Sequence, residues 1–70
     1  MNMRQIVGEN VRARRLAKGW TQEKFAEISG FSQQYISGLE KGLRNPTIVS
    51  LFELAQALGT EPTELLRAAT

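Results

Sequence analysis

The chain has 70 residues, with nine lysines and arginines, seven glutamates and a formal net charge of +2, so it is expected to form one small domain. Because it contains no Cys, His or Asp, disulfides and the usual metal ligands and general bases are excluded, and we expect no metal, no cofactor and no enzymatic activity. No apolar run could span a membrane and no segment near Met1 resembles a signal peptide, which indicates a cytoplasmic protein with no membrane partner.

A first helix is predicted from about Gln5 to Lys18, because Val7 and Val11 stand four residues apart and Gly19 follows. Residues 1–18 sum to +4, with five basic residues against one glutamate: Arg4, Arg12, Arg14, Arg15 and Lys18 against Glu9. This charge suits an anionic partner such as nucleic acid, or else it marks a solvated helix face.

A second helix is predicted over residues 22–30, with Thr21 as its N-cap and Gly30 at its end. Its buried side is expected to consist of Phe25, Ala26 and Ile28.

A third helix is predicted from Ser32, its N-cap, to about Lys41, with Gly42 closing it. Ile36 and Leu39 mark its apolar side. Together with the small residue at position 26 and the glycine at position 30, this spacing predicts two helices crossing steeply at a tight turn. The pattern is that of a helix-turn-helix over about residues 22–41.

A fourth helix begins after Thr47 and ends at Gly59, with a broad apolar stripe that is interpreted as packing: Ile48, Leu51, Phe52, Leu54, Ala55 and Leu58. Pro62 begins a short last helix behind Glu61, a poor N-cap. With no strand pattern anywhere, the five helices predict an all-α bundle.

The segment "TQEKFAEISGFSQQYISGLEKGLRNPT", flanked by "GENVRARRLAKGW" and by "LFELAQALG" and "PTELL", resembles the phage-repressor-like (Cro/repressor, XRE) helix-turn-helix family. The resemblance covers nearly the whole chain and implies one lambda-repressor-like DNA-binding domain over residues 1–70. It further implies a transcriptional regulator that binds an inverted-repeat operator in double-stranded DNA as a homodimer. Free-standing members such as restriction-modification controller proteins are the most similar in shape. We expect no small-molecule effector.

The outward side of the third helix follows from its buried side, because each residue turns by about 100°. Gln34, Ser37, Gly38 and Lys41 then point outward, with Gln33 on one shoulder. A glutamine amide can pair bidentately with adenine in the major groove. We therefore interpret Gln33, Gln34 and Ser37 as residues that contact bases. Gly38 lacks a side chain, which either removes one contact or lets the backbone approach DNA closely.

The family resemblance implies further roles for residues around this helix. Those expected to contact DNA phosphates are Gln22, Tyr35, Lys41, Arg44 and Asn45. Arg15 and Glu40 match a salt bridge between the first and third helices, and this pair is interpreted as structural.

Dimerisation is assigned to about residues 59–70, with Leu65 and Leu66 as interface candidates. Two adjacent residues on a helix point about 100° apart, so one leucine should pack inward and the other, expected to be Leu66, should stay exposed. The alternative is a protein-binding module, antitoxin-like or regulatory, that holds another protein through this surface.

Overall fold

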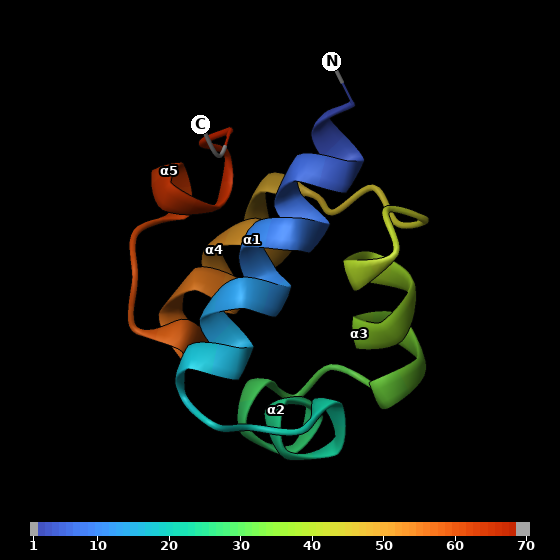
Figure 1. The fold of residues 1–70 in the computed structure, drawn as a ribbon, viewed down its shortest axis with the longest axis vertical. Helices are drawn as coiled ribbons and strands as arrows, with labels where there is room; N and C mark the ends of the chain where they lie inside the picture. Colours follow the sequence, from blue (N-terminus) through green and yellow to red (C-terminus); the bar gives the residue numbers. More distant parts are fainter. Residues whose placement is uncertain (1, 69–70) are drawn as a thin grey trace.

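The computed structural model describes residues 2–68, most of which lie in five helices (Figure 1). These are α1 (Met3–Ala17), α2 (Gln22–Ser29), α3 (Gln33–Glu40), α4 (Ile48–Leu58) and α5 (Pro62–Leu65). No strand occurs within residues 2–68, and the predicted all-α fold of five helices is confirmed. Over the same range, no helix has the length and apolar character needed to cross a membrane.

The helices begin where polar side chains can cap them. In each of the four longer helices, the side chain of the N-cap residue accepts a hydrogen bond from the backbone N–H three residues later; the caps are Asn2, Thr21, Ser32 and Thr47. Asn2 explains why α1 begins at Met3, before the predicted start. Glu61 makes no side-chain cap, as its residue type indicated, and α5 is a single turn.

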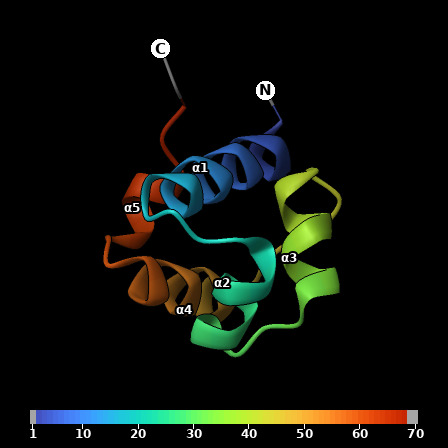
Figure 2. The same ribbon diagram turned by 60° about the horizontal axis from the view of Figure 1, so that its bottom comes forward.

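α1 contacts α3, α4 and α5, and it lies in front of α4 in Figure 1 and along the top of the molecule in Figure 2. α5 lies on one side of α1 and α3 on the other, while α2 contacts both α3 and α4. Every helix contributes to one core, whose fully buried large side chains are Val11, Phe25, Ile36, Leu39, Leu54 and Leu65. The α2–turn–α3 unit is therefore held against a single apolar centre.

Three of the apolar residues predicted to pack in the core are instead exposed. Ile28 on α2 is 43% exposed, and on α4 Ile48 and Phe52 are 87% and 54% exposed. The core takes Leu54 and Leu58 from the later part of α4. The predicted stripe was wrong at its edges, because it was wider than the surface that the neighbouring helices cover.

α1 and α3 approach each other closely at Gly8, which is buried. A Cβ atom at this position would overlap the carbonyl oxygen of Leu39 and lie 3.2 Å from the Cα of Glu40. Both of those neighbours are backbone atoms, which cannot move aside as a flexible side chain can. Gly8 therefore sets how closely the end of α3 approaches α1.

Candidate nucleic-acid interface

α3 is oriented by two buried side chains. Ile36 and Leu39 are fully buried, while Gln33 and Gln34 are exposed on the opposite side and Ser37 is half-buried. The amide groups that were predicted to face outward therefore do so. Burial of the apolar pair fixes the rotation of the helix about its axis, and with it the direction of each polar side chain.

A shallow groove runs along this outward side and brings together most of the predicted DNA-contacting residues. It is lined by Gln22, Gln33, Gln34, Ser37, Gly38, Lys41 and Leu43. Leu43, which is 71% exposed, was not predicted at the site. The signal was present in the sequence, because an apolar residue directly after the glycine that ends a helix often lies against the last turns of that helix.

A buried ion pair joins α1 to the end of α3. Arg15 donates through Nε to Glu40 Oε2 at 2.7 Å and through Nη2 to Glu40 Oε1 at 2.9 Å, and its Nη1 donates to the backbone oxygen of Trp20 at 2.7 Å. The two charged side chains are 8% and 3% exposed. The hydrogen bond to Glu40 raises the pKa of Arg15 above its usual value, so the guanidinium stays charged.

Gln22 joins the same network from the first residue of α2. Its Nε2 donates to Glu40 Oε1 at 3.1 Å. One buried carboxylate therefore holds both Arg15 and Gln22, and it links the ends of three helices. The sequence indicated the ion pair but not this third contact, because the contact depends on the angle between α2 and α3.

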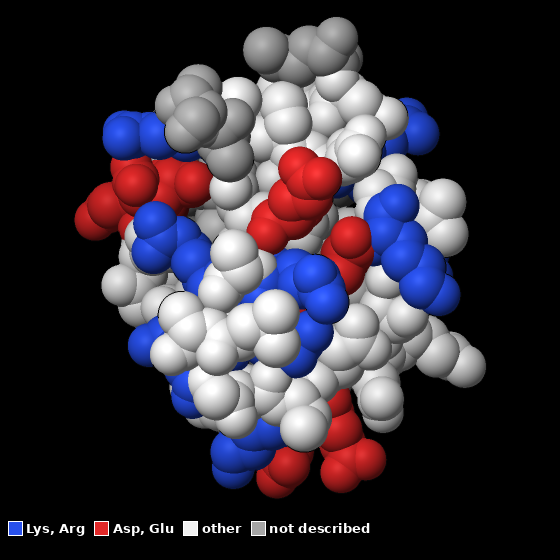
Figure 3. All heavy atoms as spheres, in the orientation of Figure 1, with Lys and Arg blue, Asp and Glu red and all other residues white. Residues whose placement is uncertain are grey.

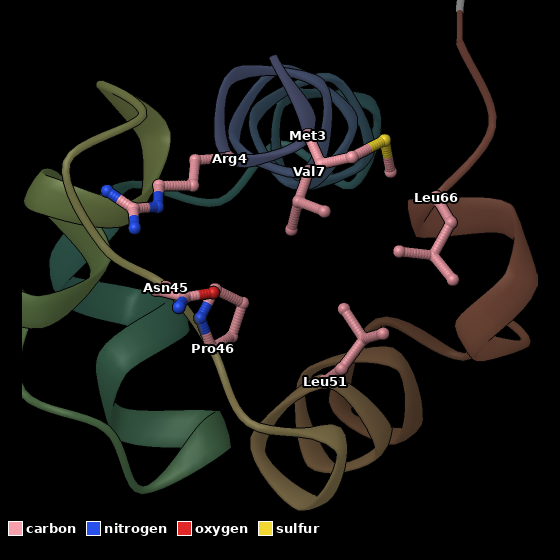
Figure 4. Close-up of a pocket in the computed structure, with 7 residues that line it drawn as sticks. All are labelled: Met3, Arg4, Val7, Asn45, Pro46, Leu51 and Leu66. Carbon is pink, nitrogen blue, oxygen red and sulfur yellow. The ribbon is translucent and has the colours of Figure 1, made fainter. Parts of the chain in front are cut away.

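Tyr35 and Arg44 lie beside the groove. The Tyr35 ring stacks on Phe31, with centroids 5.0 Å apart, and the Arg44 guanidinium carbon lies 5.5 Å from the centre of the Tyr35 ring. Arg44 and Asn45 are exposed in the segment that follows α3. Asn45 lines a different pocket, near the start of α1 (Figure 4).

The basic residues of α1 and its C-cap do not all remain free for a partner. Arg14 pairs with Glu64 at 3.4 Å, Arg15 is buried against Glu40, and Lys18 lies 5.3 Å from the centre of the Trp20 ring. On the face in Figure 3, basic and acidic groups are interspersed. Part of the positive charge of residues 1–18 is therefore engaged in contacts within the fold. Among the described residues, no group of three carboxylates is placed as metal ligands would be.

The two leucines near the end of the chain lie in different environments. Leu65 is fully buried in the core and Leu66 is 42% exposed, in the arrangement that the sequence predicted. Leu65 therefore has no free surface to offer a partner. Leu66 faces a pocket between α1, α4 and α5, which is shown in Figure 4 and is lined by Met3, Arg4, Val7, Asn45, Pro46, Leu51 and Leu66. Residues 69–70 of the predicted dimerisation segment lie outside the described residues.

Comparison with known proteins places this geometry among regulators. Residues 11–65 match the helix-turn-helix family. An uncharacterized HTH-type transcriptional regulator of Sinorhizobium fredii, y4dJ, is 56% identical over 66 residues, which are 94% of this chain and 86% of the relative. The restriction-modification controller protein C.AhdI of Aeromonas hydrophila has a similar crystal structure, with a TM-score of 0.83, 42% identity and coverage of 89% of this chain and 94% of that one.

The biofilm regulator SinR, solved in complex with DNA, also superimposes on this chain. Its TM-score is 0.82 at 29% identity, over 87% of this chain and 98% of that one. The similarity extends well beyond the two central helices. The predicted lambda-repressor-like fold is thus confirmed.

Proposed function

Since the chain belongs to the helix-turn-helix family of transcriptional regulators, we propose that it binds double-stranded DNA through α3, as a dimer on an inverted-repeat operator. The observation that carries this proposal is the row of uncharged polar groups along the outward side of α3, the exposed amides of Gln33 and Gln34 and the half-buried hydroxyl of Ser37. The related regulator SinR, which was solved bound to DNA, supports the choice of partner.

Base contacts are assigned to Gln33, Gln34 and Ser37. An α-helix fits the major groove of B-DNA, where each base pair presents its own pattern of donors and acceptors. The glutamine side chains are exposed and can offer a donor and an acceptor together. A bidentate contact to adenine N6 and N7 would favour that base by about 1–3 kcal/mol.

Phosphate contacts are assigned to Gln22 and Lys41, which line the groove, and to Tyr35 and Arg44 beside it. A further contact is assigned to Asn45, which follows Arg44 and lines the pocket near the start of α1. Gln22 is the best supported of these, because its hydrogen bond to Glu40 fixes the amide beside the first turn of α2. Backbone N–H groups at the start of a helix attract anions, and a second N–H of the Gln22 amide is available to the same phosphate.

The proposed dimer interface combines Leu66 with the first half of α4. Ile48, Val49 and Phe52 are 87%, 65% and 54% exposed, and their spacing puts them on one side of α4. Leu51, one turn after Ile48, lines the same pocket as Leu66. Exposed apolar surface of this kind is typical of protein interfaces. A two-fold axis would put two copies of α3 into successive major grooves, about 34 Å apart.

The same apolar surface also fits the second candidate, a regulatory or antitoxin-like module that holds a different protein. The two functions differ in what the purified chain does by itself. A chain that dimerises through α4 and binds DNA supports the first function. A chain that stays monomeric and gains a defined partner at α4 supports the second.

The direct test is binding to the DNA upstream of the chain's own gene. Fluorescence anisotropy would compare a duplex containing an inverted repeat with a shuffled duplex of the same composition, at one salt concentration. The proposal expects a preference of about 10³-fold or more for the repeat, the range of specific regulators. Equal affinity for the two duplexes would contradict sequence-specific binding.

A further inference from the structure

Arg44 lies across α3 because of the way this helix ends. Gly42 adopts a left-handed conformation with φ +77, its N–H donates to the carbonyl of Leu39 at 3.0 Å, and the N–H of Leu43 donates to the carbonyl of Gly38 at 2.9 Å. These two bonds form a Schellman motif, which folds the chain back along the helix it has just left. The next residue, Arg44, therefore starts beside the outward side of α3.

Gly38 provides the space into which the Arg44 side chain fits. A Cβ atom at position 38 would lie 3.0 Å from Arg44 Nε and 3.3 Å from Arg44 Cγ. Gly38 is not among the glycines with positive φ, so its backbone does not require glycine. Alanine is also the better helix former. The Arg44 side chain occupies the space that a side chain at position 38 would fill.

Tyr35 holds the far end of the same side chain. The Arg44 guanidinium carbon lies 5.5 Å from the centre of the Tyr35 ring, within the range of a cation–π interaction. Within residues 2–68, no carboxylate pairs with Arg44. Contact with the ring leaves the N–H groups of the guanidinium available to an anion, because they point outward in its plane.

We propose that Gly38 and Tyr35 are positioning residues, which hold the Arg44 guanidinium beside the DNA-facing groove for contact with a phosphate. This inference rests on the proposed function and extends it to a residue that has no side chain of its own. Gly38 lines the groove together with Gln34, its neighbour one turn earlier. A side chain ordered before binding loses less conformational freedom when the contact forms. Arg44 thus supplies from the loop the long side chain that position 38 lacks.

The test is a double-mutant cycle with Gly38→Ala and Arg44→Ala, measured as affinity for an operator duplex and for a random duplex at several salt concentrations. Gly38→Ala is expected to weaken binding to both duplexes by the same factor. It should also reduce the slope of log affinity against log salt by up to about one unit. Added to Arg44→Ala, it should cause no further loss. Equal losses in the two backgrounds, or a loss confined to the operator, would overturn the inference, since position 38 would then act on DNA by itself.

A second measurement follows Arg44 in the free protein and does not require DNA. The NMR resonance of the Arg44 Nε–H group should carry a ring-current shift from Tyr35. The shift should disappear in Tyr35→Leu, change in Gly38→Ala and persist in Tyr35→Phe, which keeps the ring. A wild type without this shift would overturn the inference while leaving the proposed function intact. A wild type that has the shift but binds no duplex would instead refute the DNA function, and with it the role of Arg44 on phosphate.

The two variants of the cycle, Gly38→Ala and Arg44→Ala, are expected to fold. Alanine at position 38 displaces only a flexible side chain and favours the helix, so the melting temperature should not fall. Lys18→Ala is the control for charge, because it removes one positive charge from an exposed residue outside both the groove and the proposed dimer interface. It should not reproduce the loss of affinity seen with Arg44→Ala, and a control that did so would overturn the specific role of Arg44.

Discussion

The outward sides of α3 and α4 differ although both helices pack on the same core. α3 presents Gln33 and Gln34, whose polar groups are satisfied only by hydrogen bonds. α4 presents Ile48, Val49 and Phe52, whose apolar side chains are removed from water only when another apolar surface covers them. The comparison teaches that one small domain can carry surfaces for two kinds of partner, and the chemistry of each surface indicates which partner it fits.

The two helices are also held in place by different forces. α4 contributes apolar side chains, Leu54 and Leu58, to the core. α3 has apolar anchors as well, but its end is fixed by the buried contact between Arg15 and Glu40. A hydrogen-bonded ion pair has a stricter geometry than apolar packing, which suits a helix whose side chains must meet base edges in register.

The largest expected effect is on stability, through the ion pair that holds the end of α3. Arg15→Ala would leave the Glu40 carboxylate buried without its partner, and breaking such a pair costs about 3–5 kcal/mol. Urea denaturation would measure this as a lowered free energy of unfolding. Arg14→Ala is the matched control, because it breaks the more exposed pair with Glu64 and should cost at most about 1 kcal/mol. Similar losses in the two variants would show that the buried pair does not hold α3.

The next effect concerns the apolar side of α4. Phe52→Glu would introduce a charge into the proposed dimer interface and should weaken dimerisation by about 2 kcal/mol or more, as for a central interface residue. Sedimentation equilibrium would measure the dissociation constant, and Leu66→Glu should weaken the dimer in the same direction. The control is Leu16→Glu, which makes the same kind of change at an exposed apolar residue of α1, outside the proposed interface. If wild type is monomeric, or if Phe52→Glu dimerises as wild type does, this interface is wrong.

The third effect tests the polar side of α3. Gln34→Ala should lower affinity for the operator by about 1–3 kcal/mol while changing affinity for random DNA much less, and Gln33→Ala should act similarly. Anisotropy titrations on both duplexes would give the ratio of affinities. Gln56→Ala, which removes an exposed glutamine from α4, should leave that ratio unchanged. A loss shared equally by the two duplexes would assign Gln34 to the backbone of DNA.

The smallest effect is expected for a phosphate contact outside the groove. Arg44→Ala should weaken binding to every sequence alike and reduce the slope of log affinity against log salt by about one unit. Titrations between low and moderate salt would measure this slope. A change in sequence preference without a change in slope would mean that Arg44 contacts a base.

Much of the fold could be predicted because the helix ends are marked by residues that act locally, through capping hydrogen bonds or a left-handed backbone. Thr21, Ser32 and Thr47 cap helices where the sequence indicated. Asn2 acts in the same way but lies before the apolar pattern begins, so the start of α1 was placed too late. The exposure of Ile48 and Phe52 could not be predicted, since periodicity identifies apolar residues but not the width of the surface that covers them.

The candidate site was predictable where it depended on a single helix. Ile36 and Leu39 were enough to orient the amides of α3. The contact between Gln22 and Glu40 depends on how α2 meets α3, and the path of Arg44 depends on the turn after α3. Both are tertiary features that no spacing within one helix encodes.

The central claim, that the outward side of α3 contacts base edges, is tested most directly by changing both partners of one contact. Each adenine of the operator half-site would be replaced in turn by 7-deazaadenine, which lacks the N7 acceptor, and affinity would be measured for wild type and for Gln34→Ala. We predict one adenine per half-site at which wild type loses affinity and Gln34→Ala loses nothing further. Losses of the same size in both proteins at every adenine would contradict the claim.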